Sequence, residues 1–196
     1  MLKVYLAGPE VFLPRGRELI DRKRAILAEF GFAPTPRHAD FLERGDASPR
    51  QFGERISRLN EELMDGADVC IANLTPFRGI SADVGTVFEV GYMIAQGKPT
   101  FGFSNDPRDY SDRAAEYFGS ASVSGDRLLS PDGEMIEQHG MADNLMIDGG
   151  VSRRGWSLVR ASTAPEQRWE DLGAFRQVLM IARDALRSEE RHDDWR

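Results

Sequence analysis

The chain has 196 residues, 41% of them hydrophobic, and a formal net charge of -7. This composition is typical of a globular protein, and we expect residues 1–196 to form a single domain. The negative charge and the absence of a Lys/Arg run argue against a nucleic-acid partner. No apolar run approaches the roughly 20 residues that a membrane span needs, so no membrane association is expected. The single cysteine, Cys70, excludes a disulfide framework and favours a cytoplasmic location.

Apolar runs and helix-spaced apolar residues alternate through residues 1–105. Short apolar runs bounded by Gly, Pro or Asn predict strands at 2–8, 32–36, 68–74 and 99–105. Apolar residues at helical spacing predict helices at 16–31, 50–67 and 82–98, the last with so little polar surface that most of it should be buried. Strands that alternate with helices give a parallel sheet covered on both faces. Right-handed crossovers then predict an α/β fold with a doubly wound, flavodoxin-like sheet of about five strands.

The second half of the chain is less regular. Residues 106–163 are rich in Gly, Ser and Asp, and we expect one short helix near 112–118 within an elaborated loop or hairpin region. An irregular segment of this length in a compact domain is usually functional or mobile. Residues 170–187 have an apolar face at helical spacing and predict a last helix, whereas the charged residues 188–196 predict a frayed tail.

Ligands of an open parallel sheet bind outside the carboxyl ends of its strands. Three segments should meet there: AGPEVF (7–12), NLTPFRGISAD (73–83) and FSND (103–106). The first contains neither the dinucleotide fingerprint nor the P-loop pattern, which excludes both of those nucleotide-binding modes. Gly8 allows close approach of a ligand to the backbone, although a plain strand-ending turn explains it equally well.

Two carboxylates mark the helix expected at 82–98. Asp83 stands at its start, where an N-cap explains it by itself. Glu89 stands among apolar residues inside the helix, where a carboxylate is costly unless it is paired, and Arg78 is a candidate partner. Alternatively, Gly85, one turn before Glu89, leaves room for a small ligand that both carboxylates flank. Two carboxylates beside one reacting bond are the equipment of glycosyl transfer.

Four stretches of the chain, taken in order, resemble the nucleoside 2-deoxyribosyltransferases: YLAGPEVF, DVCIANLTPFRG, DVGTVFEVG and DNLM. The resemblance is greatest to the purine-handling and protozoan-type members, and it covers most of residues 1–103 and a stretch around Asn144. It implies exchange of the base of a 2'-deoxynucleoside for a free nucleobase, with retention, through a covalent deoxyribosyl-enzyme. In this scheme Glu89 is the nucleophile, Asp83 hydrogen-bonds the base and helps to move its proton, and Tyr5 orients Glu89.

The resemblance also implies how the substrate is bound. Asn60 matches a base-contacting position, and Asn144 and Met146 match a segment that a neighbouring subunit inserts to hold the sugar hydroxyl. A homo-oligomer with shared active sites, dimer-based, tetrameric or hexameric, is therefore expected. Phe12 and Phe77 are candidate walls for a planar base, although both are equally ordinary core residues. The candidate substrate-binding residues are Gly8, Phe12, Asn60, Phe77, Arg78, Gly85, Asn144 and Met146.

Neither a metal nor another cofactor is expected. His38, His139 and His192 are scattered along the chain, Cys70 falls in a predicted strand, and no ligand spacing connects them. A non-catalytic sensor domain with the same kind of sheet would need paired acids after the first strand, and YLAGPEVF does not provide them.

The main alternative function is a nucleoside 5'-monophosphate N-glycosidase on the same scaffold. Such a hydrolase must hold a phosphate near the AGP turn. Glu10 follows that turn and would repel a phosphate unless Arg15 or Arg17 offsets its charge.

Overall fold

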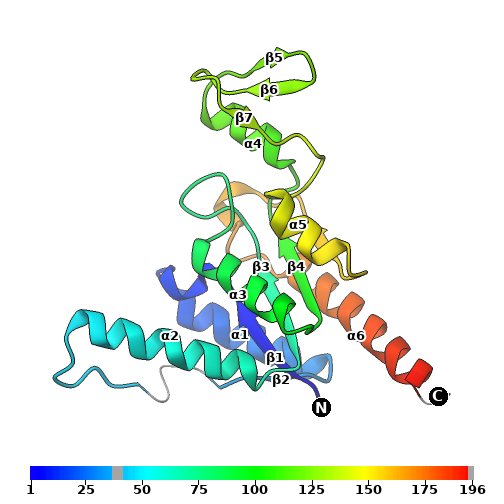
Figure 1. The fold of residues 1–196 in the computed structure, drawn as a ribbon. Coiled ribbons are helices and arrows are strands. Elements are labelled where there is room, and N and C mark those ends of the chain that lie inside the picture. The colour runs from blue at the N-terminus through cyan, green and yellow to red at the C-terminus, as the bar shows by residue number, and fades with distance from the viewer. Residues whose placement is uncertain (37–41, 194–196) are drawn as a thin grey trace.

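A parallel five-stranded sheet forms the centre of the computed structural model, which describes residues 1–36 and 42–193. All neighbouring strands pair in parallel, and their spatial order is β2-β1-β3-β4-β8. This is the 2-1-3-4-5 order of flavodoxin-like sheets, so the predicted fold class is confirmed. The strands are β1 (Lys3–Ala7), β2 (Ala33–Pro34), β3 (Val69–Asn73), β4 (Thr100–Ser104) and β8 (Leu158–Arg160) (Figure 1).

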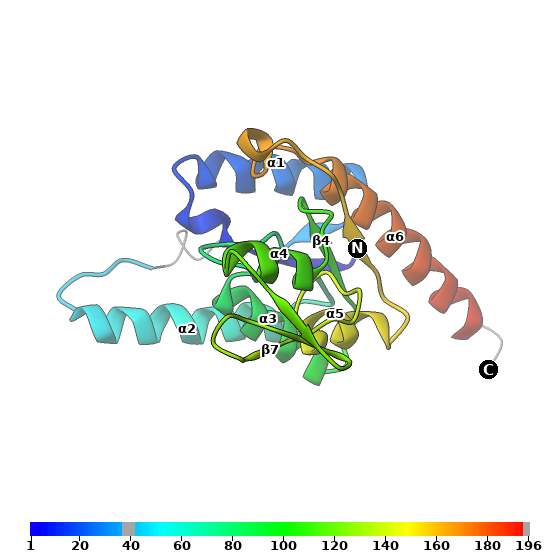
Figure 2. The same ribbon diagram turned by 90° about the horizontal axis from the view of Figure 1, so that it is seen from above.

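Helices cover both faces of this sheet (Figure 2). On one face, α1 (Gly16–Glu29) and α6 (Gly173–Asp193) bury the side chains of Val4, Ile71 and Phe103. On the other face, α3 (Val84–Ala95) and α5 (Leu145–Ser152) bury those of Tyr5 and Cys70. Adjacent residues of a strand point to opposite faces, so the mostly apolar strands supply both cores at once.

The helix α2 (Pro49–Asp65) extends beyond the edge of the sheet (Figure 1). Ser48 begins it with a capping box, in which the Ser48 hydroxyl accepts from the amide of Gln51 and the Gln51 side chain accepts from the amide of Ser48. Within this helix only Met64 is fully buried. Its apolar stripe, predicted from the sequence, remains half-buried at Phe52, Ile56 and Leu59.

The expectation that most of α3 is buried is wrong for the single chain. Val90 and Met93 are buried against the sheet, but Val84 is 85% exposed and Phe88 is 57% exposed. The helix packs on the sheet with one face only, because α2 and α5 flank it without covering its outer surface (Figure 2). An apolar residue on that surface therefore meets solvent.

The region 106–163 is more ordered than the sequence predicts. The expected short helix is present as α4 (Tyr110–Tyr117), and the expected hairpin region is a small antiparallel sheet of β5 (Ser122–Ser124), β6 (Arg127–Leu129) and β7 (Met135–Ile136). In addition, the region supplies α5 and β8, the fifth strand of the main sheet. The sequence did not reveal α5 because it contains two adjacent glycines. One of them, Gly150, lies so close to α3 that a Cβ would be 3.4 Å from Ile94 Cδ1.

Two further segments complete the chain. A 3-10 turn, η1 (Pro9–Phe12), follows β1, and another, η3 (Pro165–Gln167), precedes α6. The helix α6 continues to Asp193 and so takes in most of the expected tail, since no Gly or Pro interrupts it. Residues 194–196 lie outside the described part. Within that part, no helix is long and apolar enough to cross a membrane.

Candidate active site

Glu89 lies in the second turn of α3 and is hydrogen-bonded to a strand residue beneath it. The hydroxyl of Tyr5, in β1, donates to Glu89 Oε1 at 2.6 Å. Tyr5 is buried, and its ring points to the face of the sheet that α3 covers. The structure thus brings together two of the three predicted catalytic residues. The alternative partner, Arg78, does not bind this carboxylate, because its guanidinium lies over the rings of Phe12 and Phe77 instead.

The surroundings of Glu89 favour its neutral form. The pKa of Glu89 is raised to about 7: burial raises it most, the carboxylates of Asp83 and Glu10 also raise it, and the hydrogen bond from Tyr5 lowers it. Burial and the carboxylate of Glu89 raise the pKa of the Tyr5 phenol, which therefore stays protonated and remains a donor. A buried carboxyl group with a pKa near neutrality is characteristic of a functional site.

Asp83 caps the helix that contains Glu89. Its Oδ2 accepts from the amide of Thr86 at 3.0 Å, as expected of an N-cap, and also from the Thr86 hydroxyl at 3.2 Å. Gly85 lies beside the same oxygen, and a Cβ there would be 3.1 Å from Asp83 Oδ2. The other carboxylate oxygen of Asp83 has no hydrogen bond from the described residues that would occupy it.

A cavity of about 290 Å³ opens next to Tyr5, between α1 and α2. Its volume is at the lower end of those of small-molecule sites, about 300–1,000 Å³. It lies outside the carboxyl ends of β1 and β2, as expected for a ligand site of an open sheet. Glu89 is not among the residues of its wall, but Tyr5, which binds Glu89, is. The wall includes Tyr5, Gly8, Glu10, Arg17, Lys23, Arg24, Thr35 and Leu63.

A buried ion pair supports the floor of this cavity. Lys23 of α1 binds the carboxylate of Glu10, both being about 5% exposed, and Asn73 Nδ2 donates to Glu10 Oε1 at 2.7 Å. Gly8 makes room for this carboxylate, because a Cβ there would be 2.1 Å from Glu10 Oε2. Glu10 is therefore neutralised rather than facing the ligand as a free charge. Lys23 could not be recognised from the sequence, since a Lys on an amphipathic helix usually faces solvent.

Aromatic rings gather beside the site. Phe12 and Phe77 stack with ring centroids 5.8 Å apart, and Trp169 meets Phe77 edge-on at 5.8 Å. Arg78 packs its guanidinium over both Phe rings, at 4.9 and 4.6 Å. It has a φ of 56°, a left-handed conformation that a residue other than Gly adopts only under local constraint. Phe12 is 53% exposed, so its ring is a surface rather than core.

Asn60 lies on α2, one turn before the cavity residue Leu63. Its Oδ1 is buried, yet it accepts no hydrogen bond from the described residues. A buried acceptor without a donor loses free energy, and a bound molecule with an N–H group would restore that bond.

Asn144 and Met146 lie at the start of α5, and no hydrogen bond of the described residues joins them to Glu89 or Asp83. Asn144 Oδ1 accepts from the Met146 amide at 3.0 Å, and its Nδ2 donates to Glu137 Oε1 at 2.7 Å. Met146 is 73% exposed. The structure of one chain therefore leaves this predicted sugar-binding segment on the surface.

The described residues contain no group of three or more His, Cys, Asp and Glu that could hold a metal ion. His38 lies outside them. Cys70 is buried in β3, as predicted, and burial raises the pKa of its thiol.

The fold and the site define a class: a flavodoxin-like α/β protein with a carboxylate pair on one helix, connected through Tyr5 to a cavity at the carboxyl edge of the sheet. The profile of the Nucleoside 2-deoxyribosyltransferase family matches residues 4–146. An uncharacterized protein of Schizosaccharomyces pombe is 33% identical over 168 residues, which cover 78% of each chain. The chain therefore belongs to the nucleoside 2-deoxyribosyltransferase family.

One solved structure supports this assignment, and a second shows the same fold. The 2-desoxiribosyltransferase of Leishmania mexicana superimposes with a TM-score of 0.59 and 28% identity, covering 88% of this chain and 97% of its own. A conserved protein of Enterococcus faecalis V583 shares the fold, with a TM-score of 0.52, 18% identity, and coverage of 93% of this chain and 99% of its own. Family membership indicates an enzyme of glycosyl transfer that acts on small-molecule nucleosides and bases.

Proposed function

We propose that the protein exchanges the base of a 2'-deoxynucleoside, of purine type, through a covalent deoxyribosyl ester of Glu89. The observation that supports this most directly is the 2.6 Å hydrogen bond from the Tyr5 hydroxyl to Glu89 Oε1. It fixes the orientation of a carboxylate with an elevated pKa, and it leaves the second oxygen, Oε2, for attack on the sugar.

In the first half-reaction, Glu89 Oε2 forms a bond to C1' while the bond from C1' to the base nitrogen breaks. The electron pair of that bond stays on the base, and Asp83, at the mouth of the same helix, delivers or shares the proton that neutralises it. The transition state resembles an oxocarbenium ion. A 2'-hydroxyl withdraws electrons from this ion, so a 2'-deoxy sugar reacts faster.

In the second half-reaction, a nitrogen of the incoming base attacks C1' and its proton passes to Asp83. The C1'–O bond breaks and its electron pair returns to Glu89 as the free carboxylate. Two displacements at one carbon retain its configuration. Water in place of the base gives slow hydrolysis. Phe12 and Phe77 form the aromatic surface for the base, and Asn60 Oδ1 accepts from a base N–H.

The nucleophile is tested by incubating the protein with deoxyinosine and adenine and following deoxyadenosine. Glu89→Ala should abolish exchange with the fold intact, and a deoxyribosyl adduct should appear on the peptide containing Glu89 in the wild type only. Glu54→Gln, which removes an exposed carboxylate that pairs with Arg50, is the matched control and should exchange normally. Exchange at a near-normal rate by the Glu89→Ala protein would end the assignment.

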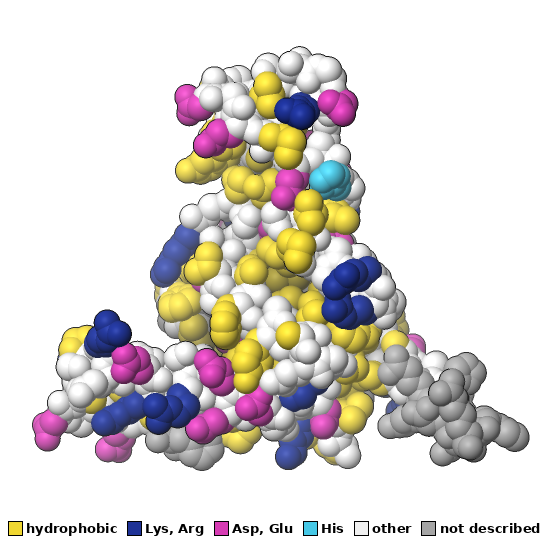
Figure 3. All heavy atoms as spheres, in the orientation of Figure 1, with side chains coloured by type: hydrophobic (Ala, Val, Ile, Leu, Met, Phe, Trp, Pro, Cys, Tyr) yellow, Lys and Arg dark blue, Asp and Glu magenta, His cyan; other side chains and the backbone are white. Residues whose placement is uncertain are grey.

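We further propose that the active enzyme is a homo-oligomer in which Asn144 and Met146 complete the site of a neighbouring chain. The outer surfaces of α3 and α5 form an apolar patch of Val84, Phe88, Leu145 and Met146, which are 85%, 57%, 38% and 73% exposed. Figure 3 shows hydrophobic side chains gathered over these helices. A second copy would bury this patch and bring its own Asn144 to a site.

Shared sites make a specific prediction for mixed oligomers. Glu89→Ala and Asn144→Ala chains should each be inactive alone, whereas a mixture that is unfolded and refolded together should recover part of the exchange activity, because hybrid oligomers contain one intact site. Activity that never returns on mixing, with oligomers formed, would show that each chain builds its own site.

The second candidate, a nucleoside 5'-monophosphate N-glycosidase, has one structural observation in its favour. Arg17 and Arg24 lie in the cavity wall, and Lys23 neutralises Glu10, which removes the repulsion that the sequence predicted. A phosphate would meet a net positive surface there. Parallel incubation with dIMP alone and with deoxyinosine plus adenine decides between the two: we expect only the second mixture to react.

A further inference from the structure

A buried arginine of α4 lies at a junction of three chain segments. Arg113 is 4% exposed and donates to three backbone carbonyls: Nε to Ile80 at 2.8 Å, Nη1 to Arg108 at 2.8 Å and Nη2 to Ala142 at 2.6 Å. Burial lowers its pKa, and the carboxylate of Asp143 opposes that effect. Ile80 belongs to the loop that leads to Asp83, and Ala142 to the segment that leads to Asn144.

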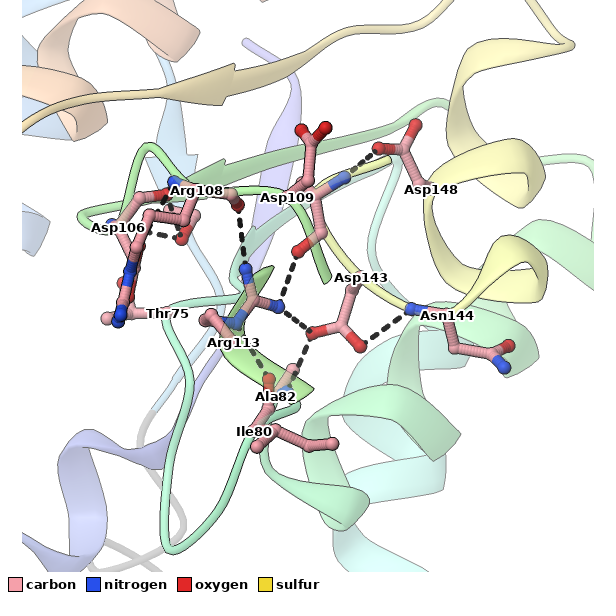
Figure 4. Close-up of polar contacts among 12 residues, drawn as sticks. Thr75, Ile80, Ala82, Asp106, Arg108, Asp109, Arg113, Asp143, Asn144 and Asp148 are labelled. Atoms are coloured by element: carbon pink, nitrogen blue, oxygen red, sulfur yellow. Dashed lines mark hydrogen bonds and ion pairs between the residues drawn. The ribbon is translucent and has the colours of Figure 1, made fainter. Parts of the chain in front are cut away.

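Asp143 continues this connection. It is 1% exposed, and its Oδ2 lies 3.7 Å from Arg113 Nη2. The same Oδ2 accepts from the amide of Ala82 at 2.9 Å, and Oδ1 accepts from the amide of Asn144 at 2.8 Å. Figure 4 shows the Asp143 carboxylate between the loop at Ala82, the guanidinium of Arg113 and the start of α5.

The two residues next to these bonds are the ones to which the proposed function gives roles. Ala82 directly precedes Asp83, and Asp143 directly precedes Asn144. Arg113 and Asp143 themselves are buried and have no hydrogen-bond contact with Tyr5 or Glu89 among the described residues. Their polar groups instead form hydrogen bonds with backbone amides and carbonyls.

We propose that Arg113 and Asp143 are positioning residues, which hold the loop that ends at Asp83 in a fixed relation to the segment that begins at Asn144. This inference rests on the proposed function, in which Asp83 serves the leaving base and Asn144 the sugar. If Asn144 acts in the site of the neighbour, the pair connects the acid of one site to the sugar contact of the next.

The variants that test this keep the size of each side chain. Asp143→Asn removes the charge and leaves one acceptor oxygen for two amide donors. Arg113→Lys keeps the charge, but an ammonium does not span three carbonyls as the guanidinium fork does. The matched control is Arg160→Lys: Arg160 also binds a carboxylate, Asp109 at 2.6 Å, and the carbonyl of Gly140, but it does not contact the loop 76–82.

The first measurement is hydrogen exchange followed by mass spectrometry, which does not depend on activity. In Asp143→Asn and Arg113→Lys, peptides covering 76–82 and 141–148 should exchange faster, by about tenfold or more, while the strands β1 and β3 keep their protection. Arg160→Lys should leave peptide 76–82 unchanged. Unchanged exchange of 76–82 in both variants overturns the proposal, whatever the activity of the wild type.

The second measurement separates positioning of Asp83 from general weakening. Deoxyinosine needs a proton on its leaving base, whereas 2'-deoxy-7-methylguanosine already has a cationic base that leaves without one. Both variants should lose about 10- to 100-fold in kcat with deoxyinosine and much less with the methylated substrate, as should Asp83→Asn. An equal loss with both substrates, together with faster exchange throughout the chain, means a role in stability only and contradicts the proposal. A wild type without exchange activity would instead refute the proposed function, and the hydrogen-exchange result would still decide this inference.

Discussion

The carboxylate of Glu89 is subject to two opposing influences. Burial and the neighbouring acids favour its protonated form, and the Tyr5 hydroxyl favours its ionised form. The balance, a pKa of about 7, means that ionisation of an attacking carboxylate occurs in the physiological range. This arrangement turns the proposed roles into pH-dependent predictions.

The exchange rate should rise with pH through about 7, because only ionised Glu89 attacks the sugar. Tyr5→Phe removes the hydrogen bond that lowers the pKa, so the midpoint of the acid limb should move to higher pH. A pH profile of kcat/KM measures this shift. The control is Tyr92→Phe. It removes a 2.9 Å hydrogen bond from the Tyr92 hydroxyl, near the carboxyl end of α3, to Asp65 of α2, and it should leave the midpoint unchanged. A Tyr5→Phe midpoint at or below that of the wild type would contradict the proposal.

Glu89 should also destabilise the folded protein as the pH rises to neutrality and above. Folding raises its pKa from 4.5 to about 7, so the unfolded chain loses the proton first and stability falls as pH rises between those values. In urea denaturation at pH 8, the free energy of unfolding of Glu89→Gln should therefore exceed that of the wild type by at most about 3 kcal/mol. At pH 4 the two proteins should have the same free energy of unfolding. If Glu89→Gln and the wild type were equally stable at pH 8 as well as at pH 4, the carboxylate would not be in a desolvated environment.

Some site residues were predicted from the sequence and others were not. Tyr5 was predicted beside Glu89 only through the family resemblance, although a doubly wound sheet does place a central strand next to the helix that covers it. Lys23, Arg113 and Asp143 were not predicted, because their burial depends on contacts with distant segments that local patterns do not encode.

At the level of elements, the helix α3 combines the cap Asp83 with the proposed nucleophile Glu89, and Gly85 lies between them in the sequence. Gly→Ala in a helix usually stabilises by about 0.5–1 kcal/mol. At Gly85 the new Cβ would be 3.1 Å from Asp83 Oδ2, so the carboxylate must move. Gly85→Ala should therefore lower the exchange rate, by about tenfold, without loss of stability.

The control for that substitution is Gly53→Ala, at an exposed position of α2 where a Cβ meets nothing within 4 Å. It should raise the free energy of unfolding by about 0.5–1 kcal/mol and leave the exchange rate unchanged. Chemical denaturation and the exchange assay, run on both variants, give the comparison. Normal activity of Gly85→Ala would mean that Asp83 does not need its present orientation.

Elements with strong local patterns were predicted well, and those defined by partners were not. The strand β8 has three residues and pairs with Gly102–Ser104, which are more than 50 positions earlier in the chain. Nothing in so short a stretch distinguishes it from a loop until the edge of β4 is there to bind it. The β5-β6-β7 sheet, exposed on most of its residues, similarly lacks the alternating burial that identifies strands.

In the molecule as a whole, the ion pair of Lys23 and Glu10 joins α1, the η1 turn and, through Asn73, the central strand β3. Lys23→Met should cost about 3–5 kcal/mol of stability, because it leaves the Glu10 carboxylate buried and unpaired. Adding Glu10→Gln should recover part of that loss. Arg22→Met, on the same helix, removes an exposed pair with Glu170 and should cost no more than about 1 kcal/mol. Equal costs for the two single variants, measured by thermal unfolding, would contradict this account.

The helix α6 has a consequence for how the molecule is made. It supplies Phe175, Val178, Leu179 and Ala182 to the core beneath Val4 and Phe103. Since a ribosome delivers the chain from its amino end, all five strands of the sheet and the helix α1 emerge before α6, and the part of this face that α6 covers stays exposed until then. Until α6 emerges, the apolar side chains beside α1 are bare, and the nascent chain is prone to aggregate through them.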